Sequence, residues 1–182
     1  MCFINRRMYR EYMNKKNIAV GFVVICLLVV ALIILNQKST IAELEDTYKR
    51  KNFTKFAKVY SLLPINLKAS NKVRGLKALV DSKEVMRGKG ISKIKIMQIK
   101  MQTKSLLALI VDFEKQKMMT HEYIELMRRR IDLLILGLGL ADNVNIKKKF
   151  KADILYDIFR LESQKLVNVA YRKSVLKRIE NY

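Results

Sequence analysis

The sequence predicts an all-α protein with a single N-terminal transmembrane helix followed by a basic helical bundle of four to five helices. Three observations support this prediction: an unbroken apolar run near the N-terminus, apolar residues at helical spacing through the rest of the chain, and only one proline and six glycines in 182 residues. The 51% hydrophobic content excludes an intrinsically disordered chain, and the two cysteines exclude a disulfide-rich miniprotein.

The apolar run extends from Ile18 to Leu35 without a strongly polar side chain. As a helix it would cover roughly 27 Å, close to the ~30 Å hydrocarbon core of a bilayer. Only a helix carries a single segment through lipid, because its backbone groups are all paired within the segment. We therefore expect residues 18–36 to span a membrane, with these side chains in the span: Ile18, Val20, Phe22, Leu27, Leu28, Ile33 and Leu35.

A cleaved signal peptide and a buried core helix are the alternatives for this run. A signal peptide has a shorter apolar region of ~7–15 residues and a small-residue cleavage site, and only the poor candidate Thr40-Ile41-Ala42 follows the run. A core helix would carry polar residues on one face, and this run has none. An uncleaved single-span anchor fits the sequence better than either alternative.

The charges that flank the run predict its orientation. Residues 1–17 form a basic flank with a net charge of +4, in which the cations are Arg6, Arg7, Arg10, Lys15 and Lys16. Beyond the run, Lys38 is the only cation before Lys49, and three acids lie between them. The positive-inside rule then places the N-terminus in the cytoplasm and residues 37–182 outside it, at a plasma or inner membrane. That domain carries a net charge of +17, but long domains translocate largely regardless of charge.

The first helix of the outer domain is expected to begin at the capping-box sequence Thr40–Glu43 and to end near Leu62, because Pro64 cannot continue it. Its apolar stripe consists of Ile41, Leu44, Tyr48, Phe56, Val59 and Leu63, with Asn52 as a polar interruption. A second helix is expected from about Leu67 to Met86, before the chain break Gly88-Lys89-Gly90.

Three further helices complete the predicted bundle. One covers about residues 91–118, where length decides for a helix although its first part briefly alternates like a strand. The next begins at the N-cap Thr120, carries Glu122 in its first turn and ends before Asp142. The last runs from about Asn145 to Ile179 with one apolar side, formed by Leu155, Ile158, Phe159, Leu166, Val169, Ala170 and Leu176.

Catalytic and metal chemistry have little support in the sequence. His121 is the only histidine, and the cysteines lie before and inside the apolar run, so a zinc site lacks its usual ligands. Glu122 and Glu125 share a helix face, but nothing indicates the cleft that a pair of catalytic carboxylates requires. The glycines near Lys89 lack the spacing of a phosphate-binding loop. We expect a protein that is not an enzyme and needs no cofactor.

Clustered cations are the strongest polar signal. They are candidates for contact with an anionic surface: Lys51, Lys55, Lys58, Arg128, Arg129, Arg130, Lys147, Lys148 and Lys149. Anionic lipid, a wall polymer and nucleic acid all attract such residues, and nucleic-acid binders usually add a recognition motif that is not evident here. The simpler explanation is compositional, since a chain rich in lysine, isoleucine and asparagine is typical of an AT-rich genome.

The segment from Leu133 to Leu140 is apolar almost all round and too short to span a membrane. Its leucines form either a buried central helix or a surface that docks a subunit or dips into the bilayer: Leu133, Leu134, Leu136, Leu138 and Leu140. Gly137 and Gly139 each weaken a helix by roughly 1 kcal/mol relative to alanine, so we expect a closely packed neighbour or a bend there.

The function expected from these features is non-catalytic: a single-pass, membrane-anchored interaction or scaffold component of a membrane or cell-envelope assembly. Its partners would be the lipid bilayer, another membrane or envelope protein, and an anionic lipid or wall polymer. The alternative is a membrane-tethered module that binds a polyanion, including nucleic acid.

Overall fold

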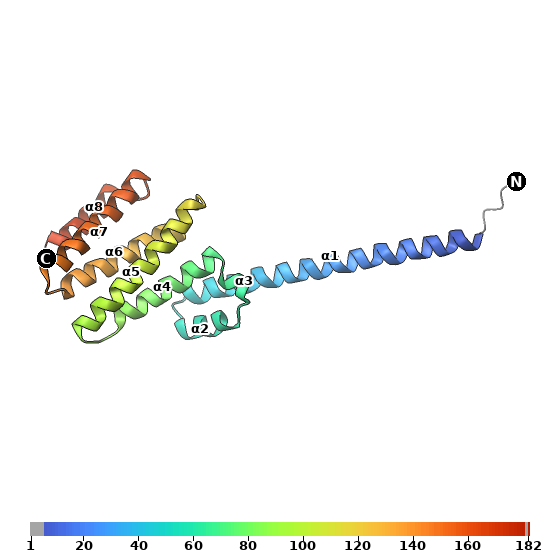
Figure 1. The fold of residues 1–182 in the computed structure, drawn as a ribbon, viewed down its shortest axis with the longest axis horizontal. Coiled ribbons are helices and arrows are strands. Elements are labelled where there is room, and N and C mark those ends of the chain that lie inside the picture. The colour runs from blue at the N-terminus through green and yellow to red at the C-terminus, as the bar shows by residue number, and fades with distance from the viewer. Residues whose placement is uncertain (1–5, 181) are drawn as a thin grey trace.

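The computed structural model describes residues 6–180 and 182, with the backbone alone for residues 6–19, 38 and 39. The regular structure in this part of the chain is entirely α-helical, which confirms the predicted fold class. Its helices are α1 (Arg6–Lys49), α2 (Phe53–Leu62), α3 (Ile65–Lys68), α4 (Asn71–Arg87), α5 (Ser92–Lys115), α6 (His121–Leu140), α7 (Val144–Ser163) and α8 (Val169–Glu180). Figure 1 shows α1 as a long rod that leaves a bundle formed by its own C-terminal end and the other helices.

Helix α1 continues through the sequence that was expected to start a new helix. The Thr40 hydroxyl donates a 2.8 Å hydrogen bond to the Asn36 carbonyl within α1, so Thr40 is not an N-cap. A side-chain hydroxyl can bond to the carbonyl four residues earlier without ending a helix. The predicted helix start at Thr40 is therefore wrong, and the apolar run and the first core residue, Leu44, belong to one helix.

The chain breaks instead at residues 50–52. Lys51 adopts a left-handed conformation with φ of 57°, and the amides of Lys51 and Asn52 donate to the carbonyls of Tyr48 and Thr47. These two hydrogen bonds form the Schellman motif that commonly ends a helix. Asn52 then caps α2 by accepting from the Lys55 amide. The single helix predicted for this region is thus two helices, although Pro64 follows the end of α2 as expected.

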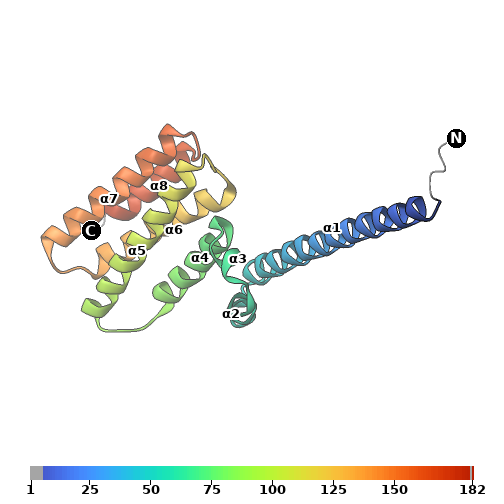
Figure 2. The same ribbon diagram turned by 45° about the vertical axis from the view of Figure 1, so that its right-hand side comes forward.

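Helix α6 lies at the centre of the bundle and packs against α4, α5, α7 and α8. Its position follows from its sequence, since apolar side chains on most of its circumference can be buried only when neighbours surround it. Tyr123, Leu126, Met127 and Ile131 on this helix are completely buried. Figure 2 shows α5, α6, α7 and α8 grouped at the end of the bundle away from the rod, where α5, α7 and α8 all pack against α6.

The last predicted helix is also two helices, α7 and α8. Lys165 is left-handed, with φ of 56°, and a second Schellman motif ends α7 there. The expected apolar side is wrong in part. Leu155, Phe159 and Val169 are exposed, whereas Ile158 is buried and Leu166 and Leu176 pack against the core. The buried side of α7 is formed by Phe150, Ile154, Asp157, Ile158 and Leu161.

Candidate functional site

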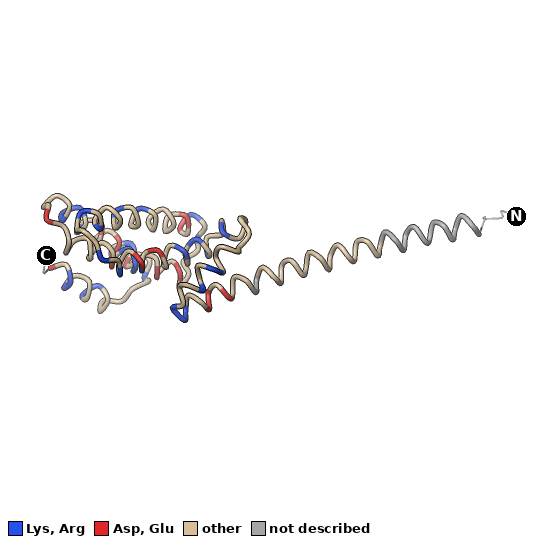
Figure 3. The backbone as a smooth tube through the Cα atoms, turned by 90° about the horizontal axis from the view of Figure 1, so that it is seen from below, with Lys and Arg blue, Asp and Glu red and all other residues tan. Residues whose placement is uncertain are grey.

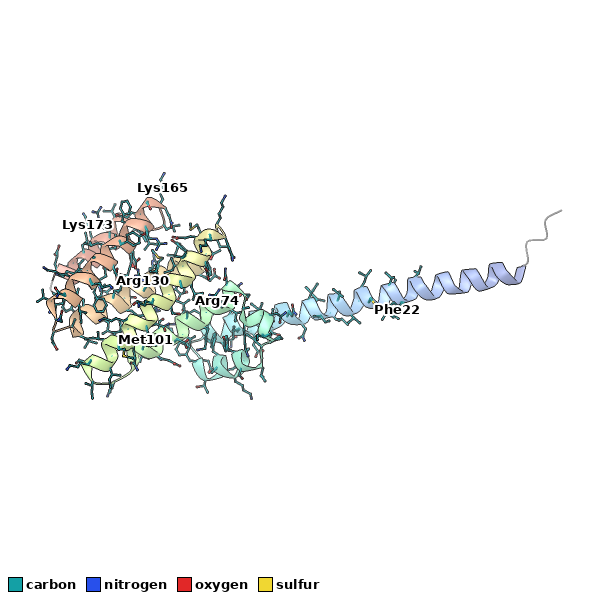
Figure 4. The ribbon with its side chains drawn as sticks, in the orientation of Figure 1. Phe22, Arg74, Met101, Arg130, Lys165 and Lys173 are labelled. Atoms are coloured by element: carbon teal, nitrogen blue, oxygen red, sulfur yellow. The ribbon has the colours of Figure 1, made fainter. Side chains whose placement is uncertain are left out.

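The apolar part of α1 packs against nothing else in the described structure. From Val20 to Leu35 every side chain is exposed, and none of the span is buried. Phe22, for example, stands free on the rod in Figure 4. Six of the seven side chains predicted to span the membrane are exposed, and the seventh, that of Ile18, lies outside the described side chains. The five predicted topology-setting cations of residues 6–16 also lie outside the described side chains.

This helix is long and apolar enough to cross a membrane, with a mean hydropathy of 2.7 over its most apolar window. Its complete exposure disagrees with the core-helix alternative, because a core helix would be covered by its neighbours. A signal sequence near the N-terminus meets the same criteria of length and composition. An anchor and a signal sequence therefore both agree with the fold.

The three consecutive arginines of α6 point in different directions. Successive helical residues are about 100° apart, so three in a row cannot share a face. The Arg128 guanidinium lies 5.0 Å from the centre of the Tyr171 ring, and Arg129 is half-buried with Nη1 3.4 Å from the Met86 sulfur. Arg130 is buried. The expectation that all three form one cationic surface is corrected: Arg128 alone is exposed.

Arg130 instead joins three helices inside the bundle. Its Nε donates to the Thr103 carbonyl on α5 at 3.2 Å, and its Nη1 pairs with Asp157 on α7. Nη2 is 3.9 Å from the carboxylate of Asp153. Burial raises the pKa of Asp157 to about 6, although the guanidinium charge opposes this shift. Figure 4 shows Arg130 in the middle of the bundle, where the pair connects α5, α6 and α7.

A hollow of about 380 Å³ opens beside this ion pair, between α5 and α7. Its polar lining has more cations than acids, and its apolar lining includes an aromatic ring: Lys100, Thr103, Lys104, Leu107, Arg130, Lys149, Phe150 and Asp153. Lys149 and Arg130 are the only members predicted from the sequence. Lys100 and Lys104 on α5 were not predicted, because each stands between uncharged neighbours in the sequence and nothing local marks them as part of a site.

The other predicted cations do not gather at one place. Lys51 and Lys58 are exposed near α1, and Lys55 pairs with Glu43 at 3.1 Å. Lys147 and Lys148 lie at the start of α7. Figure 3 shows lysines and arginines on all sides of the bundle with fewer acids among them. The positive charge is therefore spread over the surface and does not form a single patch.

The leucine-rich end of α6 divides into core and groove. Leu133, Leu134 and Leu138 are buried in the core. Leu136 and Leu140 are partly buried and line a groove of about 560 Å³, together with Tyr182. This segment is therefore mostly central core, and the groove beside it is the only part of it open to a partner among the described residues.

Two outward-facing apolar surfaces were not predicted. The outer face of α7 consists of Leu155, Tyr156 and Phe159, all about half exposed or more. The outer face of α5 consists of Ile94, Met97 and Met101, each more than half exposed; Met101 is labelled in Figure 4. The sequence does carry the signal, because both helices have apolar residues on opposite sides, a pattern that one buried face does not explain.

Two further carboxylates, Glu114 and Glu125, form structural contacts between helices. The Tyr123 hydroxyl donates to Glu114 at 2.7 Å, and Arg160 pairs with the same carboxylate. Partial burial by itself would raise the pKa of Glu114, but the hydrogen bonds and the guanidinium charge lower it overall. His121 is exposed, and Glu125 accepts a hydrogen bond from Tyr48. In the described part of the chain no three metal-ligating side chains come together.

Comparisons with known proteins add no relative. No protein-family model, curated protein or solved structure matches the chain. The features of this chain that bear on function are therefore its apolar rod, the outer faces of α5 and α7, and the cationic hollow.

Proposed function

We propose that this protein is a single-pass, membrane-anchored interaction component of a membrane or cell-envelope assembly, with its N-terminus in the cytoplasm and its helical bundle outside. One observation carries the proposal: the exposed apolar run of α1 is continuous with a helix whose C-terminal end is part of a packed core. Water disfavours such a run, and lipid is the solvent in which its exposure is favourable.

The outer face of α7 supports the interaction role. Contiguous exposed apolar surface on a folded domain commonly marks a contact with another protein. Leu155 and Phe159 are one helical turn apart, with Tyr156 beside them, which is the arrangement that one helix presents to another. An anchor confines the bundle to a thin layer, so that a modest contact on this face is enough to hold a partner.

The anchoring is tested by extracting membranes with alkaline carbonate and sequencing the N-terminus of the mature chain. We expect the full chain to stay in the membrane pellet. A mature chain that begins after Leu35, or that is released by carbonate, would overturn the proposal. A reporter fused after Tyr182 tests the orientation, which is wrong if the reporter works only in the cytoplasm.

The interaction is tested by placing a photocrosslinking residue at Phe159 in cells that make the protein. We expect a discrete crosslinked product, and the same probe at the exposed Lys173 of α8 serves as the control. Equal labelling from both positions would indicate random collisions and contradict a docking role for the outer face of α7. Loss of the product after Leu155→Ser, without loss of protein, would support that role.

A second candidate function, polyanion binding, is favoured by the hollow between α5 and α7. Lys100, Lys104 and Lys149 give it more positive than negative charge. Binding to phosphates releases counterions, so such affinity falls steeply with added salt. Retention of the detergent-solubilised full chain on duplex DNA tests this, with weaker retention and a salt-dependence slope smaller by about one in Lys104→Gln as the expected result. Unchanged retention in Lys104→Gln would contradict a role for the hollow.

A further inference from the structure

The turn between α2 and α3 exposes two large apolar side chains. Ile65 is 86% exposed and Leu62 is 75% exposed, the highest values among the large apolar residues that the structure describes. Between them, Leu63 is buried, and the extended backbone of Leu63 and Pro64 separates the two helices. Leu63 therefore fixes the turn to the core while the apolar residues on either side of it point into solvent.

The turn lies beside the place where the apolar run leaves the bundle. Helix α2 turns back along α1, so that Lys55 pairs with Glu43. Leu62 is seven residues beyond Lys55, and Leu35 is eight residues before Glu43, which corresponds to about 10 and 12 Å of helix. Figure 1 shows α2 and α3 next to this part of α1. The turn thus comes close to the level at which the apolar run ends.

The charges around the turn are positive. Lys58 is exposed one helical turn before Leu62. The Lys68 ammonium donates to the Ser61 carbonyl at 3.0 Å, which holds this cation next to the turn. The three acids of the adjoining part of α1 are each paired with a cation: Glu43 with Lys55, Glu45 with Lys72 and Asp46 with Arg50.

A bilayer interface offers this combination of partners. Apolar tips enter the boundary between headgroups and acyl chains, while lysines extend toward lipid phosphates. An anionic leaflet attracts each such cation further. If the turn faced only water, its lysines would be well solvated, but the exposed side chains of Leu62 and Ile65 would have no favourable environment.

We propose that the α2–α3 turn is a second membrane contact of this protein, in which Leu62 and Ile65 enter the interface and Lys58 and Lys68 contact anionic headgroups. This inference rests on the proposed membrane anchor. A rod alone leaves the bundle free to tilt and rotate against the bilayer. With the turn as a second contact, one side of the bundle faces the lipid.

Depth-dependent fluorescence quenching in vesicles tests the proposal on the full chain. Cys2 and Cys26 are first replaced by serine and alanine, and single cysteines at positions 29, 65 and 91 are labelled with an environment-sensitive fluorophore. The vesicles contain phosphatidylglycerol and a quencher-bearing lipid, in two preparations: a quencher just below the headgroup for positions 65 and 91, and a quencher near the end of the acyl chain for the deep position 29. Ile91 is the matched control, since it is also an exposed isoleucine but lies beyond the far end of α4, whose 17 residues span about 25 Å.

We expect quenching at positions 29 and 65 and none at position 91. Quenching at 29 with equal, weak signals at 65 and 91 would overturn the second contact while leaving the anchor intact. A label at 29 that is not quenched would overturn the anchor, and the second contact with it. The replacement of Ile65 leaves the core unchanged because that side chain is exposed.

A charge reversal tests the headgroup contact separately. Lys58→Glu is expected to reduce quenching at position 65, whereas the same reversal at the exposed Lys89, beyond the far end of α4, leaves it unchanged. Equal quenching in both variants would overturn the role of Lys58.

Discussion

Replacing Gly137 by alanine should destabilise the bundle, although alanine is the better helix former. A β-carbon at this position would lie 2.7 Å from Cε2 and 3.0 Å from Cζ of Phe150, and 3.2 Å from Cγ2 of Ile99. Phe150 is 3% exposed and Ile99 is completely buried, so neither side chain can move away without disturbing the core. Overpacking of this kind costs about 1–3 kcal/mol.

The gain in helix propensity offsets about 1 kcal/mol of that cost. We therefore expect Gly137→Ala to lose about 1 kcal/mol of stability, or about 2–4 °C in Tm for a domain of this size. Gly75 in α4 is the matched control, because its added β-carbon would make only ordinary van der Waals contacts, the nearest being 3.6 Å to Cζ of Phe113 and 3.7 Å to Cδ1 of Leu126. Gly75→Ala should therefore be stabilising by up to about 1 kcal/mol.

The assay is urea or thermal unfolding of the full chain in detergent, followed by tyrosine fluorescence, since the chain has eight tyrosines and no tryptophan. The opposite signs of the two substitutions are the decisive result. A Gly137→Ala variant as stable as Gly75→Ala would falsify the close packing of α6 against α7.

Three other substitutions test features of the bundle. Asp157→Ala should cost up to about 3–5 kcal/mol, because it leaves the buried Arg130 charge with only the longer, 3.9 Å contact to Asp153. Replacing both Asp157 and Arg130 by apolar residues should recover most of that loss in denaturant titrations. Lys165→Gly should stabilise the fold by about 0.5–1 kcal/mol and raise Tm, because glycine adopts the left-handed conformation without strain. Lys173→Gly, within α8, should lower Tm. Equal shifts in Tm for the two variants would disprove the left-handed conformation of Lys165. The lowered pKa of Glu114 stabilises the fold above its usual value of 4.5, and this contribution is lost as the pH falls through the lower, folded-state value. Glu114→Gln should therefore have a lower free energy of unfolding than the wild type at pH 7. In denaturant titrations at lower pH, the difference between the two proteins should become smaller.

The sequence predicts helices well where composition marks their ends. Pro64 and the glycines at 88 and 90 coincide with real helix ends, and Asn143 caps α7 after the predicted break at Asp142. The missed ends share one cause. Lys51 and Lys165 occupy the left-handed position of Schellman motifs, where glycine is usual, so their residue type gave no signal of a break.

The surfaces were harder to predict for another reason. Arg130 belongs to a run of cations, and only its distant partner Asp157 shows that it is buried. Leu155 and Phe159 resemble core residues by type. The sequence shows apolar residues on two sides of α7, but the fold alone shows which of the two stripes is buried. Whether a residue on a two-sided helix faces in or out depends on tertiary contacts, which local periodicity does not contain.

Helix α1 runs unbroken from its apolar run to Leu44 in the core, and this continuity has a mechanical consequence. Torque or lateral force applied to the rod inside the lipid passes directly to the bundle, because no flexible joint lies between them in α1. The direction in which the outer face of α7 points in the plane of the membrane is then set by the rotation of α1 about its own axis. Inserting one residue after Leu35 would rotate the bundle, and with it the outer face of α7, by about 100° relative to the apolar run.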